Sequence, residues 1–140
     1  MSEENKAIIR KICEAWNSGN IEELDQYFAP NFHAHSVPPG MPPVLDTAKA
    51  SNQMFNEAMP DENVDILDMV AEGDRVFVRT RVTGTNEGGM PWFGVGPNNA
   101  KVDNESWALY RLENGKVVES WGVNDAGILF QLGAVAMPQG

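Results

Sequence analysis

The sequence is poor in cysteine and in basic residues, and it has no long apolar run. Its single cysteine, Cys13, rules out an internal disulfide, and its place on the apolar side of an expected helix favours a small buried filler over a nucleophile. Ten basic residues against twenty acidic ones give a net charge of −10, which argues against nucleic acid or an anionic membrane as a partner. No apolar run approaches the ~20 residues that span a bilayer, and the N-terminus is charged rather than signal-like. A cytoplasmic protein is therefore expected.

The first half of the chain has the periodicity of helices. Apolar residues recur at helical spacing up to Gly19, which is a typical helix stop. Asn20 and Glu23 are placed for a capping box at the start of a second helix, and Pro60 ends a third. We expect the helices at residues 3–18, 21–28 and 46–59, with a short extended segment at 32–35.

The second half has the pattern of strands. Four long strands are expected at residues 64–72, 75–85, 101–112 and 116–124, followed by a helical turn at 126–132 and a loose tail at 134–140. Helices first and an antiparallel run of strands second are typical of the α+β class, with helices on one face of a curved sheet. No linker interrupts the pattern, so a single domain over residues 1–140 is expected.

The longest irregular stretch, residues 86–99, is rich in glycine and proline yet carries Met90, Trp92 and Phe93. Long loops in compact domains are usually functional or disordered, and the aromatic residues favour a function. Two interpretations stay open: a flap over a pocket, or a segment that packs on its own domain or on a partner subunit.

The end of the last strand delivers a carboxylate. Trp121, Val123 and Asp125 alternate, so in an extended segment they point to one face of the sheet. A lone aspartate beside a tryptophan and a valine is costly unless that face lines a pocket. The alternative is that Asp125 caps the helix that begins at Ala126.

The turn at Asn114-Gly115 decides which residues of the preceding strand lie beside Asp125. A two-residue turn would place Asn104 and Ser106 on that face. A three-residue turn with a glycine bulge would instead place three others there: Asp103, Glu105 and Trp107.

Several segments, in this order, resemble a known family. They are Ala15–Asn20 (AWNSGN), Tyr27–His35 (YFAPNFHAH), Met59–Asp61 (MPD), Ala71–Val76 (AEGDRV), Val82–Thr85 (VTGT) and Tyr110–Trp121 (YRLENGKVVESW), the last continuing through Asp125 to Gln131-Leu132-Gly133. Together they are similar to SnoaL-like polyketide cyclases of the NTF2-like superfamily, over nearly the whole chain.

The resemblance implies a cone-shaped α+β barrel that forms a homodimer or homotetramer through its outer sheet face. It implies intramolecular aldol ring closure on a small, apolar, polyketide-like carbonyl substrate, with acid/base catalysis and neither metal nor organic cofactor. Asp125 matches the family's acid/base aspartate, and His35 matches a histidine frequent in relatives. An apolar pocket around Asp125 would raise its pKa toward the working pH.

Other residues are weaker candidates for the site. His33 and His35 lie two apart, but no cysteine is near and the carboxylates are scattered, so no metal is expected. Arg81 is a candidate for stabilising an enolate, or is a solvated or interface residue. The candidate pocket walls are Trp16, Phe55, Trp92, Phe93 and Trp121, with Glu105 and Trp107 if the bulged register holds.

Two alternatives to ring closure remain at this point. Isomerisation of a ketone or hydrolysis of an epoxide would keep the pocket and change the chemistry, and the epoxide route could use Glu105 and Arg81. A non-catalytic small-molecule binder would instead have Asp125 turned toward the helix and aromatic residues alone holding the ligand.

Overall fold

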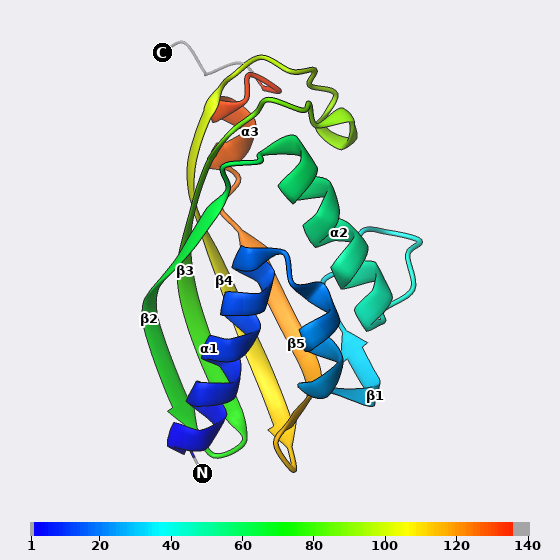
Figure 1. Ribbon diagram of the computed structural model, residues 1–140, viewed down its shortest axis with the longest axis vertical. Helices are drawn as coiled ribbons and strands as arrows, with labels where there is room; N and C mark the ends of the chain where they lie inside the picture. The colour runs from blue at the N-terminus through cyan, green and yellow to red at the C-terminus, as the bar shows by residue number, and fades with distance from the viewer. Residues whose placement is uncertain (1, 136–140) are drawn as a thin grey trace.

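The computed structural model describes residues 2–135 and contains one curved, five-stranded sheet with helices on one face (Figure 1). In chain order the elements are α1 (Ser2–Ser18), the 3-10 helix η1 (Ile21–Gln26), β1 (Phe28–Ala34), α2 (Leu45–Ala58), β2 (Asn63–Glu72), β3 (Arg75–Thr85), the 3-10 turn η2 (Pro91–Phe93), β4 (Lys101–Glu113), β5 (Lys116–Asn124) and α3 (Gly127–Gln131). The strand order is β1-β5-β4-β3-β2. The predicted α+β class is confirmed, and the sheet is mixed because β1 pairs with β5 in parallel.

The predicted second helix was wrong in length and in its cap. It is a 3-10 helix that ends at Gln26, and Phe28 already belongs to β1. The Asn20 side chain donates to the Glu23 carboxylate (2.8 Å) and does not cap a backbone amide. Pro30 lies inside β1, which tolerates a proline because it is an edge strand. Of the predicted tail, residues 136–140 lie outside the described residues.

The core has two parts. In the larger one, Ile9 and Ile12 of α1 are fully buried against Val76 and Val78 of β3. The smaller one, here called the flap cluster, lies at the end of the molecule that carries α3 and loop 86–99 (Figure 1). Its buried members are Ala58, Met59, Met90, Val102, Ile128 and Leu132. Among the described helices, none is both long and apolar enough to cross a membrane.

The hairpin between β4 and β5 combines features of both predicted registers. Asn114 (φ 51°) and Gly115 (φ 76°) form a two-residue turn, as their left-handed conformation allows. Beyond the turn the pairing shifts by one residue, and Val118 forms a β-bulge next to Val117, so that both valines are buried. After the bulge Trp107 lies opposite Val123, so Glu105 and Trp107 share the face of Asp125, and Asn104 and Ser106 lie on the other face.

Candidate active site in the cone

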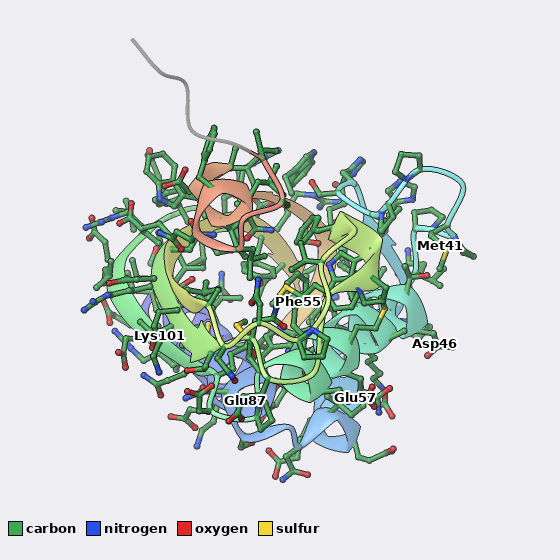
Figure 2. All side chains as sticks on the ribbon, turned by 90° about the horizontal axis from the view of Figure 1, so that it is seen from above. Met41, Asp46, Phe55, Glu57, Glu87 and Lys101 are labelled. Atoms are coloured by element: carbon green, nitrogen blue, oxygen red, sulfur yellow. The ribbon has the colours of Figure 1, made fainter. Side chains whose placement is uncertain are left out.

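The sheet curves around α1 and α2 (Figure 1), and the space between them is here called the cone. It contains a cavity of about 240 Å³ between α1, α2 and the helix side of the sheet. Its apolar walls include Trp16 of α1 and Phe55 of α2, as the sequence predicted, together with Val64 and Val82. Figure 2 looks down on the end of the molecule that carries α3 and loop 86–99. It shows Phe55 near the middle of the ring of ribbons, while the labelled acidic residues lie toward its edge. Polar groups reach the same space from Asn52, Glu62, Thr80, Ser106 and Tyr110.

Loop 86–99 packs against the wall of this cavity. Its aromatic residues, Trp92 and Phe93, contact Phe55, with ring centroids 5.2 Å and 6.5 Å away. Met90 is fully buried in the flap cluster. The loop therefore packs on its own domain, as one of the two interpretations expected, and it does so beside the cavity.

Asn86 holds this loop in one conformation. The Asn86 side chain is fully buried, and its Nδ2 donates to the carbonyl oxygen of Gly96 (3.0 Å) and to Oδ1 of Asn98 (2.9 Å). Its Oδ1 accepts a hydrogen bond from the amide of Gly89 (2.9 Å). The amide nitrogen and the amide oxygen of Asn86 are therefore both paired within the loop. These hydrogen bonds hold together a segment that has little regular secondary structure.

Among the described residues, Glu62 is the only acidic one on the cavity wall. It stands directly before β2, and its carboxylate makes no hydrogen bond or ion pair with another described residue. Burial without a compensating charge disfavours the ionised form, and it raises the pKa of Glu62 from 4.5 to about 7. A carboxyl group with such a pKa can accept and return a proton near neutral pH.

The neighbouring carboxylate, Asp61, anchors the segment that presents Glu62. Its two oxygens accept hydrogen bonds from the amide (2.7 Å) and the hydroxyl (2.8 Å) of Thr85, at the end of β3. Lys101 Nζ donates to the same hydroxyl (2.9 Å). These bonds lower the pKa of Asp61, so two adjacent carboxyl groups differ: Asp61 is ionised and positions the chain, and Glu62 titrates in the cavity.

Two other titratable groups on the wall stay protonated at neutral pH. Burial raises the pKa of the Cys13 thiol to about 11 and raises the pKa of the Tyr110 phenol. Both can donate hydrogen bonds, but neither forms an anion at working pH. Acid/base chemistry inside the cone therefore falls to Glu62.

Asp125 lies on the opposite, outer face of the sheet. Trp121, Val123 and Asp125 do share a face, as predicted, but Val123 is 66% exposed. Asp125 is exposed, and its Oδ1 accepts a hydrogen bond from the amide of Gly127 at the start of α3 (2.9 Å). The prediction that Asp125 faces into the cone was wrong. The Asp125 side chain does bond an amide near the helix start, but the capping alternative is not met as stated, because α3 begins at Gly127 and its N-cap residue is Ala126.

A separate hollow of about 210 Å³ lies beside Asp125 on this outer face. It is lined by Glu105, Trp107, Val123, Asn124 and Asp125. Glu105 stands here as the bulged register predicted, but its carboxylate is ion-paired with Arg79. The catalytic role of Asp125 stays a prediction, now for a site outside the cone.

His35 is also on the outer face and is not a neighbour of Asp125. Its Nε2 lies 2.8 Å from the carboxylate of Glu119, and its ring stacks on Trp121 at 4.6 Å between centroids. Asp125 lies four residues beyond Trp121, roughly 13 Å along an extended strand. Hydrogen bonds from His35 and Arg111 lower the pKa of Glu119. Within the described residues, no group of three or more histidine, cysteine or acidic side chains could hold a metal ion.

Arg81 and Trp107 are outside the cone as well. Arg81 donates two hydrogen bonds to the carboxylate of Asp103 (2.8 and 2.6 Å), an exposed pair on adjacent strands. Trp107 is 45% exposed, and its ring meets the edge of Phe77 at 5.8 Å. The expected oxyanion role of Arg81 therefore has no support from its position, and the same holds for Trp107 as a wall of the cone.

Comparison with known proteins identifies the family. A family model described as SnoaL-like polyketide cyclase matches residues 6–132. The chain belongs to this family. A comparison with curated proteins gave no significant match.

Solved structures of the NTF2-like fold agree with the SnoaL-like assignment. AclR, a candidate hydroxylase from Streptomyces galilaeus, has a TM-score of 0.86 and 26% identity, over 99% of this chain and 87% of AclR. A candidate polyketide cyclase from Bacillus cereus has a TM-score of 0.82 and 27% identity, over 95% of this chain and 83% of its own. IdmH, a candidate polyketide cyclase from Streptomyces antibioticus, has a TM-score of 0.81 and 28% identity, over 92% of this chain and 98% of IdmH.

In this SnoaL-like chain, sequence reasoning missed Glu62. A signal was present: Glu62 lies two residues before Val64, and alternation carried back from the strand places both side chains on the same face. Thr80 and Tyr110 were also missed, and Ser106 was expected to face the pocket in only one of the two registers, because these faces could be assigned only once the register was known.

Proposed function

We propose that this SnoaL-like protein is an acid/base enzyme that acts on a small carbonyl compound inside the cone, with Glu62 as the proton-transfer group. The observation that carries the proposal is a carboxyl group with a pKa of about 7 on the wall of a largely apolar cavity whose other described lining residues are neutral. Family membership supports a cyclase-type function, and the aldol step and the identity of the base belong to the proposal.

The proposed reaction is an intramolecular aldol ring closure. The Glu62 carboxylate takes a proton from a carbon next to a carbonyl, and the resulting enolate carbon forms a bond to a second carbonyl carbon of the same molecule. That second carbonyl becomes an alkoxide, which receives the proton from Glu62. Substrate and product are isomers, so the step needs no oxidant, reductant or cofactor, and Glu62 ends in its starting form.

The cavity favours an uncharged substrate. The described residues that line it include no lysine, arginine or histidine, and the one carboxyl group among them, Glu62, would repel an anion when ionised. A volume of about 240 Å³ lies below the ~300–1,000 Å³ of typical ligand pockets, which favours a compound of one or two rings. Trp16, Phe55 and Val82 supply the apolar contact surface.

Hydrogen–deuterium exchange at carbon tests the proposal without knowledge of the natural substrate. 2-Tetralone is a neutral two-ring ketone with acidic α-protons, and proton NMR in D2O follows their loss directly. We expect the protein to accelerate this exchange and Glu62→Gln to remove roughly 100-fold or more of the acceleration, the usual contribution of a general base. Equal acceleration by both proteins would overturn the role of Glu62.

The alternatives fit the cone unequally. Ketone isomerisation would use the same proton abstraction by Glu62 and shares its test. Epoxide hydrolysis was expected to draw on Glu105 and Arg81, but these lie on the outer face in ion pairs with Arg79 and Asp103. A non-catalytic binder would hold 2-tetralone without exchanging its protons.

We also propose that a second copy of the chain covers the outer face. Phe77, Leu109, Trp107 and Trp121 line an apolar hollow there, and exposed apolar patches often mark protein–protein contacts. Pairs of opposite charge lie beside it on β3 and β4, so the face can complement itself under a two-fold axis.

A further inference from the structure

Two buried polar atoms in the part of the chain that the structure describes have no hydrogen-bond partner in the protein. They are the indole nitrogen, Nε1, of Trp92 and the amide oxygen, Oδ1, of Asn104. Buried polar groups in folded proteins are nearly always paired, because an unpaired group loses its bond to water and gains nothing in return. Both residues lie at the same end of the cone.

Asn104 lies on the helix side of β4, next to two residues that line the cavity. It is 7% exposed, lies opposite Val82 of β3, and is two residues from Ser106, and both of these neighbours line the cavity. Two residues in the other direction, Val102 belongs to the flap cluster. The amide of Asn104 therefore stands between the cavity and the cluster beneath loop 86–99.

Trp92 packs against the same cluster from the loop. Its ring packs on Phe55, which lines the cavity, and both rings pack against the flap cluster that contains Val102. The hydrogen bonds of Asn86 fix the loop, so the indole N–H stays buried in this position. Other buried side chains around it, such as Thr85 and Asn86, have their partners.

We propose that Trp92 and Asn104 are the polar contacts that select the ligand of the cone. The indole N–H donates to a carbonyl oxygen of the ligand, and the Asn104 amide oxygen accepts a hydrogen bond from a ligand hydroxyl. The ligand class is thus an uncharged compound that carries a carbonyl group and a hydroxyl group on a compact apolar body. This inference rests on the proposed function only in placing the ligand in the same cavity.

Four probes that share a naphthalene body separate the two contacts. They are naphthalene, 2-naphthol, 2-acetylnaphthalene and 2-acetyl-6-hydroxynaphthalene, and equilibrium dialysis gives Kd for each. We expect the last to bind the wild-type protein most tightly. Trp92→Phe should weaken binding of the two ketones roughly three- to tenfold, the range for one hydrogen bond. The ratio of the Kd values of naphthalene and 2-naphthol should not change. Asn104→Leu should weaken only the two hydroxyl probes by a similar factor.

Two control variants separate hydrogen bonding from packing. Phe93→Leu removes apolar bulk beside Trp92 and should weaken all four probes alike. Asn31→Leu makes the Asn104 substitution at an exposed position of β1 and should change none of them. Because the prediction is a ratio between probes bound to one protein, a general loss of stability in a variant does not imitate it.

The outcomes are distinguishable. Equal weakening of all probes by Trp92→Phe or by Asn104→Leu would overturn the inference and assign the two residues to packing alone. Failure of all four probes to bind the wild-type protein would overturn both this inference and the proposed cavity site. The predicted probe pattern without α-proton exchange of 2-tetralone would uphold the inference and overturn the proposed enzyme.

Discussion

Replacing Glu62 with glutamine should stabilise the protein at alkaline pH and leave its stability nearly unchanged at acid pH. The pKa of Glu62 is raised in the folded protein, so between pH 4.5 and 7 the folded state holds a proton that the unfolded chain has released. The stability of the wild-type protein that depends on this proton is present below pH 4.5 and is lost as the pH rises to 7. Glutamine, which is neutral throughout, avoids that loss.

The size of the effect follows from the same difference. Between 4.5 and about 7 there are about 2.5 pKa units, and each unit corresponds to about 1.4 kcal/mol. The upper limit is therefore about 3.5 kcal/mol above pH 7, and partial contact of Glu62 with solvent reduces the expected gain to about 2 kcal/mol. For a chain of this size that raises Tm by roughly 6 °C.

Urea unfolding of the wild-type protein and of Glu62→Gln at pH 5 and pH 8 measures the effect. The gap between the two proteins should open from pH 5 to pH 8. Glu22→Gln, at an exposed position of η1, is the matched control and should show no such opening. A Glu62→Gln protein that is equal to or less stable than the wild-type protein at pH 8 would refute the reasoning, because it would show that the cone does not penalise the charge.

Three further changes test other parts of the structure. Val64→Phe, which fills the cavity, should weaken 2-tetralone binding at least about tenfold in a calorimetric titration, and unchanged affinity would move the ligand out of the cone. Thr85→Val removes the hydroxyl that Asp61 accepts from, so α-proton exchange should slow several-fold at unchanged affinity; equal loss of binding would make the contact merely structural. Trp107→Glu should convert the proposed oligomer to a monomer in analytical ultracentrifugation, and an unchanged sedimentation coefficient would show that the outer face is not the contact.

The strands were predictable because their signals are local. Turn residues bound each one, and the predicted limits of 75–85 and 116–124 match β3 and β5. The side of the sheet that faces the helices was not predictable by the usual rule, which assigns the more apolar face of a strand to the helices. On β5 the outer face carries Trp121 and Val123, while the helix side carries Ser120 and Gly122, so the more apolar face is the wrong one. A cavity wall of small and polar residues produces this inversion.

The β-bulge at Val118 explains the rest of the error. Asn114-Gly115 predicts a two-residue turn, and that turn is present, but one extra residue in β5 exchanges the faces of every side chain beyond it. In the sequence, the bulge is marked only by two adjacent valines, Val117 and Val118, which are both buried in the structure. Glu62 lies just outside β2, in the connection from α2, and its raised pKa depends on burial by elements distant in sequence.

The central claim is that proton transfer takes place in the cone at Glu62 and not on the outer face at Asp125. The direct measurement is the rate of 2-tetralone α-proton exchange in D2O for two variants, Glu62→Gln and Asp125→Asn, beside the wild-type protein. The structure predicts loss of exchange in Glu62→Gln and retention in Asp125→Asn. Loss of exchange in Asp125→Asn with retention in Glu62→Gln would contradict it and place the reaction in the hollow beside α3.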